Sequence, residues 1–369
     1  MMVGNMVESG AGIRPEMKAL YHTLTLLLLA FLLAAGSARA LDKWIQSSFD
    51  GVDYVNLRDV CQFYGFTPKQ GRPGYTSYGA GNRVLSLRAG KHDFYVNAFR
   101  YILSYPVREH AGALYISSTD MQKLVDPVLR PKLGRAENIT TVVLDPGHGG
   151  HDAGAKGLYA LEKDCNLALA LKVRDKLKRA GFRVVMTRDA DFFLTLQQRV
   201  DIANRVPNSL FVSIHHNSGG RAAAGIETFT LAPHGTTSPF ARTRRTEELS
   251  GNNQDSENIA LATAVHAHAI KKTAAPDRGI QRARFSVLCT IRRPAILFEG
   301  GFVTHPQEGQ KVANPSYQDI LAQCICDGIV RYRDTARKHT TQQPQRYSAP
   351  TQRPGAGRPL SSTPIPRSS

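Results

Sequence analysis

Four residues between positions 148 and 299 carry the side chains of a hydrolytic metal site. His148, His215 and Glu299 each follow an apolar run that is typical of a buried strand, and Glu162 precedes a run with helical spacing. Two imidazoles and one carboxylate are the ligand set of a catalytic zinc ion with an open fourth position. A second carboxylate nearby is the expected general base. The four residues form no local zinc motif such as H-E-x-x-H, so a fold must bring them together.

The pattern of residues 140–335 predicts such a fold. Apolar runs typical of strands lie at 141–144, 183–187, 210–214, 226–231 and 295–298, and runs with helical spacing lie at 165–180, 196–204, 258–271 and 317–332. Continuous apolar strands that alternate with helices indicate an α/β domain with a mostly parallel sheet flanked by helices. Ligands bind at the carboxyl ends of the strands in such sheets, which is where His148, His215 and Glu299 fall.

A smaller unit precedes this domain. Residues 41–134 contain short runs in which apolar and polar residues alternate, and Gly, Pro, Asn and Ser separate these runs. Helices are expected near 57–63 and 118–124. This pattern predicts a small α+β domain, and it loosely resembles the strand-rich N-terminal modules of copper amine oxidase type found on some bacterial envelope proteins. We expect exposed tyrosines here that either pack on the strands or stack on sugars, namely Tyr75, Tyr78, Tyr101 and Tyr105.

The two ends of the chain differ from domain material. Residues 1–40 read as a signal peptide, with an apolar run from Leu24 to Ala35 and a small-residue cleavage pattern that ends at Ala40. The run is shorter than the ~20 residues of a membrane span, so we expect export to the periplasm or cell envelope rather than an uncleaved anchor, with no transmembrane segment after cleavage. Residues 340–369 are rich in Pro, Gln, Arg, Ser and Thr without an acidic residue, and they predict a disordered basic tail.

The overall charge points to an anionic partner. The chain has 47 Lys and Arg against 30 Asp and Glu, a net charge of +17 and a pI near 9.8. Such a charge attracts nucleic acid, membrane surfaces or anionic wall polymers, and export argues against nucleic acid. The five cysteines are too few and too scattered for a disulfide framework, and Cys324 and Cys326 are expected to be buried.

Seven segments together resemble one enzyme family. They are VVLDPGHGGHDAGAKG (142–157), LEKDCNLALALKV (161–173), VVMTRDADFFLTLQQRVDIAN (184–204), LFVSIHHNS (210–218), GIETFTL (225–231), RGIQRARFSVL (278–288) and PAILFEGGFVTHPQE (294–308). In type and order they resemble the zinc-dependent N-acetylmuramoyl-L-alanine amidases of the type 3 family. The resemblance implies that His148, Glu162 and His215 bind Zn²⁺ and that Glu299 is the catalytic carboxylate. It further implies hydrolysis of the amide between N-acetylmuramic acid and L-alanine in peptidoglycan, and a regulatory activator protein as a partner.

Some residues depart from the family pattern. His216 stands where the family commonly has a small residue, but consecutive side chains of a strand point to opposite faces, so only one of His215 and His216 addresses the metal. Glu299 is followed by Gly300-Gly301, where a bulkier residue often precedes the second glycine. Five further histidines match no ligand position and are expected at the surface or in packing, namely His151, His234, His266, His268 and His305.

Two questions stay open at this stage. The polar insertion 233–258 is either a surface loop or a gate over the site, in which Arg242, Arg244 and Arg245 contact carboxylates. The alternatives to an amidase are a catalytically inactive protein that binds the cell wall and a zinc peptidase or deacetylase that acts on another envelope amide.

Overall fold

The computed structural model describes residues 44, 46–134, 138–237 and 247–341. The predicted signal peptide at 1–40 lies outside the described residues, as does the predicted tail at 340–369 except for its first two residues, which belong to a helix. One compact unit extends over Ile45–Gln343 and contains both predicted domains. Within the described residues, no helix combines the length and the apolar character needed to cross a membrane.

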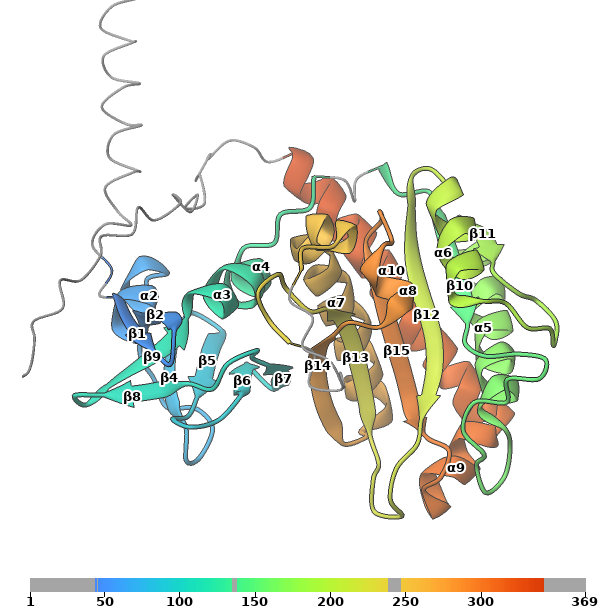
Figure 1. Cartoon of the computed structure of the whole chain (residues 1–369), viewed down its shortest axis with the longest axis horizontal. Coiled ribbons are helices and arrows are strands. Elements are labelled where there is room, and N and C mark those ends of the chain that lie inside the picture. The colour runs from blue at the N-terminus through green and yellow to red at the C-terminus, as the bar shows by residue number, and fades with distance from the viewer. Residues whose placement is uncertain (1–43, 45, 135–137, 238–246, 342–369) are drawn as a thin grey trace, which may run out of the picture. The chain divides into compact units, whose positions relative to one another are not determined.

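The second domain is built on six strands in the order β11-β10-β12-β15-β13-β14 (Figure 1). Their bounds are β10 Thr141–Pro146, β11 Arg183–Met186, β12 Ser209–Asn217, β13 Ile226–Leu231, β14 Asp277–Ala283 and β15 Ala295–Phe302. All neighbouring pairs are parallel except β13 with β15, which is antiparallel. The mostly parallel sheet predicted from the sequence is therefore confirmed, with β14 as an additional strand that the sequence pattern did not indicate.

Helices cover both faces of this sheet. Their bounds are α5 Glu162–Arg179, α6 Leu196–Arg205, α7 Asp255–Thr273, α8 Ser286–Cys289, α9 Pro306–Ala313 and α10 Pro315–Thr341. Helices α5 and α7 pack on the strands of one face, and α10 packs on both of these helices. Helices α6 and α8 pack on the other face, where their side chains form one apolar cluster with Phe211, Phe229 and Leu297. Because side chains alternate along a strand, every second residue after Phe211 in β12 and after Leu297 in β15 also points to this second face.

The first domain, which we call the N-terminal module (residues 46–134), is the predicted α+β unit. Its elements are β1 Gln46–Phe49, β2 Val52–Asn56, α2 Leu57–Phe63, β3 Thr67–Pro68, β4 Thr76–Ala80, β5 Arg83–Leu87, β6 Asp93–Val96, β7 Phe99–Ile102, β8 Arg108–His110, β9 Ala113–Ser117, α3 Ser118–Asp120, η1 Met121–Val125 and α4 Asp126–Leu129. Strands β1-β2-β9-β8 form a small antiparallel sheet, and β3 to β7 form an antiparallel run of neighbours.

The N-terminal module is joined to the second domain through a shared sheet. Strand β7 pairs with β14 at Tyr101 and Ile280, which continues the sheet from one domain into the other. The Arg100 backbone N–H donates to Asp277 Oδ2 at 3.0 Å, and the Tyr101 hydroxyl donates to Thr263 Oγ1 at 3.3 Å. The expectation of an exposed Tyr101 is therefore wrong, because this ring is buried at the junction. Tyr105 also serves the junction, since its hydroxyl donates to the Gly235 carbonyl at 3.1 Å.

The polar insertion 233–258 is described only at its two ends. Residues 238–246, which include Arg242, Arg244 and Arg245, lie outside the described residues, so the gate stays a prediction. The end of the insertion is not loop, because Ser250–Gln254 forms the short 3-10 helix η3 and α7 begins at Asp255. Asn252 is buried there and donates to the Ala232 carbonyl at 3.0 Å.

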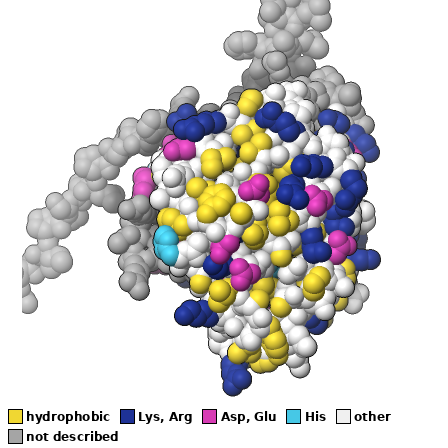
Figure 2. Space-filling model, turned by 90° about the vertical axis from the view of Figure 1, so that its right-hand side faces the viewer, with side chains coloured by type: hydrophobic (Ala, Val, Ile, Leu, Met, Phe, Trp, Pro, Cys, Tyr) yellow, Lys and Arg dark blue, Asp and Glu magenta, His cyan; other side chains and the backbone are white. Residues whose placement is uncertain are grey.

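Basic side chains are spread over one face of the surface (Figure 2), and Cys324 and Cys326 are buried as predicted. Figure 2 shows one face of the described molecule, with Lys and Arg side chains spread over it among hydrophobic and acidic ones. Positive charge is therefore distributed on this face and not gathered in a single patch. The cysteines are free thiols, and Cys324 and Cys326 are buried in α10.

Candidate metal centre

His148 lies in a turn at the carboxyl end of β10, and hydrogen bonds from two arginines hold this turn in place. His148 has a φ of 61°, a left-handed conformation that is uncommon for a residue with a side chain. Two arginines hold this turn through its carbonyl groups. Arg199 donates to the carbonyls of Pro146 and His148, both at 2.7 Å, and Arg188 donates to the carbonyl of Gly147 at 2.8 Å. The surrounding structure therefore imposes the strained conformation that carries the imidazole.

A buried carboxylate holds one of these two arginines in place. Asp145 is fully buried, and it accepts hydrogen bonds from Arg199 Nη1 at 2.8 Å, Thr187 Oγ1 at 2.6 Å and Ser213 Oγ at 2.8 Å. Three neighbouring elements are thus tied to the end of β10. This network could not be predicted from the sequence, because nothing in the local pattern around Asp145 identifies partners more than 40 positions away.

Replacing Arg199 by Ala is expected to lower the free energy of unfolding by about 3–5 kcal/mol, because it leaves Asp145 charged, buried and without its ion pair. Denaturant unfolding of the variant measures this loss. Arg205→Ala, an exposed change on the same helix, is the matched control and should stay within about 0.5 kcal/mol of the wild type. Equal stability of the two variants would contradict the role given to the Asp145 pair.

Three of the four predicted site residues meet around one point. Glu162 Oε1 lies 3.1 Å from His148 Nε2 and 2.9 Å from His215 Nδ1. One ligand atom from each residue lies within 4.8 Å of the other two. Glu162 reaches this point from the first turn of α5, and His215 reaches it from near the end of β12. The structure thus brings together residues that come from three separate segments of the chain.

Neighbouring groups fix the orientation of these side chains. His148 Nδ1 bonds Asp152 Oδ2 at 2.8 Å, so its Nε2 faces Glu162. Glu162 Oε2 accepts from the backbone N–H of Ala155 at 2.8 Å. Burial by itself would raise the pKa of Glu162, but the hydrogen bonds from His148 and His215 outweigh it and hold the pKa well below its usual range. A second hydrogen bond on a ring nitrogen is what a metal-ligating histidine ordinarily makes.

The donor set and the space around it fit a zinc ion. Two imidazole nitrogens and one carboxylate oxygen match the protein ligands of catalytic zinc. Glycines line the cluster closely: a Cβ on Gly147 would lie 2.2 Å from His215 Nε2, and a Cβ on Gly154 would lie 2.6 Å from Glu162 Oε2. No larger residue can occupy these two positions without moving a candidate ligand.

Gly147→Ala is accordingly expected to weaken zinc binding by roughly 10- to 100-fold, the size of effect seen when the surroundings of a metal ligand are disturbed. A competition titration against a chromogenic chelator measures the affinity. Gly220→Ala is the control, because a Cβ at Gly220 would meet no atom within 4 Å. Equal zinc affinity in both variants would show that zinc binding does not depend on the present position of the His215 ring.

The fourth predicted residue, Glu299, lies beside this cluster on the neighbouring strand. Glu299 is the register partner of His215 in parallel β12 and β15, and of Glu227 in antiparallel β15 and β13. The three side chains therefore point to the same face of the sheet. Glu299 Oε2 is buried and has no hydrogen-bond partner among the described residues. Burial first, and then the charges of Glu162 and Glu227, raise the pKa of Glu299 well above its usual value.

Glu227 is a charged neighbour that the sequence analysis did not single out. It is buried and accepts hydrogen bonds from Arg278 Nε and from Gln281 Nε2, the latter at 2.7 Å. The residues come from β13 and β14, so this pair of strands holds a fixed carboxylate next to Glu299. The sequence feature that could have identified Glu227 is a glutamate inside an otherwise largely apolar run, GIETFTL.

The six other histidines of the second domain lie outside the cluster, as predicted. His216 points to the opposite face from His215, is buried, and its Nδ1 bonds Asn166 Oδ1 at 2.8 Å. Burial lowers the pKa of His216 to about 4, and Asn166 in turn donates to Glu162 Oε1 at 3.3 Å. The others are not in the cluster: His151 packs on Phe193, His234 is exposed, His266 is buried between Thr228 and Asp277, His268 bonds a carbonyl of its own helix, and His305 caps α9.

Comparison with known proteins identifies the family. The family model described as N-acetylmuramoyl-L-alanine amidase matches residues 142–331. The chain is 36% identical over 194 residues to the uncharacterized protein YqiI of Bacillus subtilis, an alignment that covers 53% of this chain and 85% of that protein. It is 30% identical over 243 residues to the N-acetylmuramoyl-L-alanine amidase AmiA of Escherichia coli, covering 59% and 84%. A solved structure, the amidase AmiC2 of Nostoc punctiforme, is 36% identical, with coverage of 53% and 97% and a TM-score of 0.45. The chain therefore belongs to the N-acetylmuramoyl-L-alanine amidase family.

Proposed function

We propose that this protein is a zinc-dependent N-acetylmuramoyl-L-alanine amidase, which hydrolyses the amide between N-acetylmuramic acid and the L-alanine of peptidoglycan stem peptides. The observation that carries the proposal is the cluster of His148, Glu162 and His215 with Glu299 on the adjacent strand. Membership of the amidase family supports the choice of substrate. An inactive wall-binding protein has no need of this set of four residues.

In this proposal His148, Glu162 and His215 hold the metal. When bound, zinc supplies Lewis-acid polarisation of the amide carbonyl and a lowered pKa for water. Asp152 and Ala155 keep His148 and Glu162 in the orientation that the metal requires.

Glu299 is the proposed general base and acid. Its carboxylate takes a proton from the attacking water and returns it to the amine of L-alanine as the amide bond breaks. The buried Oε2 without a protein partner supports this role, because the oxygen has no competing hydrogen bond to lose. The raised pKa of Glu299 favours its holding the proton until the amine leaves.

The cellular setting proposed for this activity is the periplasm or cell envelope, where peptidoglycan lies. The predicted signal peptide and the positive net charge support this setting. Control of the enzyme by an activator protein stays a prediction.

The direct test is a digest of purified peptidoglycan with the mature protein, with and without a chelator, analysed by mass spectrometry. We expect free stem peptides that begin with L-alanine, lost with chelator and restored by added zinc. Fragments cut within the peptide would instead indicate a peptidase, loss of acetyl groups a deacetylase, and an unchanged polymer a binding protein.

A further inference from the structure

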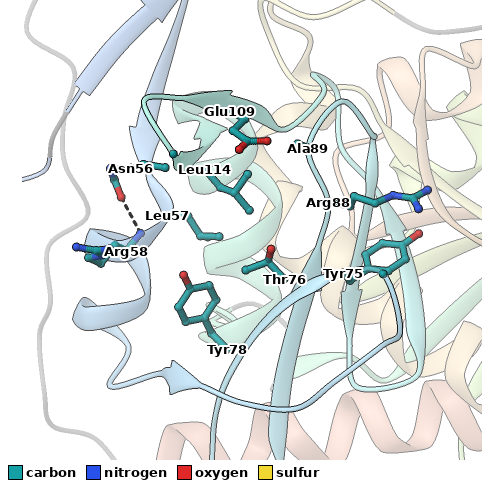
Figure 3. A pocket seen from close by; sticks show the side chains of 13 residues that line it. Asn56, Leu57, Arg58, Tyr75, Thr76, Tyr78, Arg88, Ala89, Glu109 and Leu114 are labelled. Atoms are coloured by element: carbon teal, nitrogen blue, oxygen red, sulfur yellow. Dashed lines mark hydrogen bonds between the residues drawn. The ribbon is translucent and has the colours of Figure 1, made fainter.

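The N-terminal module contains a pocket that the proposed chemistry does not use. Its volume is about 470 Å³, and its lining comes from the start of α2, from β4 and the two residues before it, from the two residues after β5, and from the β8–β9 hairpin (Figure 3). Two tyrosines, Tyr75 and Tyr78, and three charged side chains, Arg58, Arg88 and Glu109, contribute to it. None of the four candidate site residues of the second domain lines this pocket.

The three charged side chains of the pocket, Arg58, Arg88 and Glu109, are exposed. Elsewhere in the module Arg100, Arg108 and Arg130 each pair with an aspartate. By contrast, the side chains of Arg58, Arg88 and Glu109 form no ion pair and no hydrogen bond with any part of the chain that the structure describes. Figure 3 shows Arg58 and Arg88 at opposite ends of the pocket with Glu109 between them, so only an extended ligand can reach all three charged groups.

One wall of the pocket is a fixed aromatic ring. The Tyr75 ring meets the Tyr95 ring edge to face, with centroids 5.3 Å apart and an interplanar angle of 85°. The Arg88 guanidinium lies 5.0 Å from the Tyr75 ring centre, and Figure 3 shows the two side chains next to each other. Tyr95 is buried, so Tyr75 is held against the core of the module and presents its ring without a large loss of freedom on binding.

From these groups we propose that the pocket binds a stem peptide of peptidoglycan at a distance from the bond that is cut, and so tethers the enzyme to its polymer. Guanidinium groups bind the carboxylates of the peptide, and Glu109 binds an ammonium group of a diamino acid. The Tyr75 ring can pack against an aliphatic or sugar surface of the same ligand. The identity of the polymer rests on the function proposed above, whereas the carboxylate-binding character rests on the pocket alone.

The presence of Glu109 argues against a simple polyanion as the ligand. A chain of phosphates has no cation to offer, so it would bring its negative charge against an unpaired carboxylate. A peptide that carries both carboxylates and an ammonium group can satisfy all three charged side chains. This charge pattern is why we choose the stem peptide and not a phosphate-containing wall polymer.

The test uses the full mature chain with Arg58→Ala and Arg88→Ala combined, and with Lys91→Ala and Lys132→Ala combined as the control. Lys91 and Lys132 are exposed residues of the same module that do not line the pocket, so both double variants lose the same charge. Titration calorimetry with a soluble stem peptide that contains a diamino acid measures binding, with the catalytic change Glu299→Gln present in every protein. We expect the affinity of the Arg58/Arg88 variant to fall by about tenfold or more relative to the control, as loss of a charge-assisted contact implies.

Two further experiments are needed. The first distinguishes a stem peptide from a phosphate-containing polymer as the ligand, and the second distinguishes failure of the tether from failure of the amidase proposal. A phosphate-containing wall polymer should not compete with the peptide, and competition at equal concentration of charge would overturn the assignment. In proteins with Glu299 intact, turnover of a small soluble muropeptide should be the same for the Arg58/Arg88 variant and its control, while cleavage of intact peptidoglycan at low enzyme concentration should fall. Equal peptide affinity of the two double variants would refute the tether even in an active amidase, whereas peptide binding without any turnover would refute only the amidase.

Discussion

Replacing Glu299 by Gln is expected to lower the rate of peptidoglycan cleavage by roughly 10²–10⁴-fold, the usual contribution of a general base, while the bound zinc stays at one ion per chain. The amide keeps the shape of the side chain but cannot accept a proton. Glu299 is not part of the His148, Glu162 and His215 cluster, so the metal should remain. Release of stem peptides from labelled peptidoglycan gives the rate, and elemental analysis gives the zinc content.

The control for this change is Glu248→Gln, which makes the same substitution at an exposed glutamate of the same domain. It should keep the wild-type rate. A Glu299→Gln variant with full turnover and bound zinc would mean that another group, with Glu227 the nearest candidate, carries the proton.

His148→Ala should remove zinc and activity together. The variant loses one of three candidate protein ligands, and the remaining two give a much weaker site. Loss of a group that hydrogen-bonds to a metal ligand weakens metal binding by roughly 10–100-fold, and loss of a ligand itself should weaken zinc binding by more than that. When zinc is limiting, we expect the rate of cleavage to fall by the same factor as the zinc affinity. Competition with a chelator measures affinity, and the peptidoglycan digest measures activity.

His151→Ala is the matched control for the His148 variant. It removes an imidazole three positions away in the same loop, but that ring packs on Phe193 with centroids 4.2 Å apart and does not join the cluster. Its zinc content should equal that of the wild type. A His148→Ala protein that is replete with zinc and active would contradict the ligand assignment.

The sequence could predict the elements of the second domain because their signals are local. The continuous apolar runs before His148, His215 and Glu299 became β10, β12 and β15, and their carboxyl ends carry these residues at one rim. The start of α5 at Glu162 also follows from the helical spacing that comes after it. Convergence of the site could therefore be anticipated from the rule that places ligands at strand ends.

What the sequence could not predict depends on partners far along the chain. Strand β14, with the sequence DRGIQRA, has no apolar run, and its arginines are acceptable in a sheet only because Glu227 and Asp255 neutralise them. The ion pair of Asp145 with Arg199 is likewise invisible before the fold is known. Tyr101 was misplaced for a related reason, because its burial comes from β14, a strand of the other domain.

If three side chains share one zinc ion beside Glu299, anomalous diffraction at the zinc absorption edge, from crystals of the full mature protein, will locate that ion. We expect a single strong peak about 2.0–2.2 Å from Nε2 of His148, a carboxylate oxygen of Glu162 and a ring nitrogen of His215, with the Glu299 carboxylate facing the open side of the ion. A zinc peak bound by other residues, or coordinates in which these three ligand atoms stand too far apart to share an ion, would contradict this assignment.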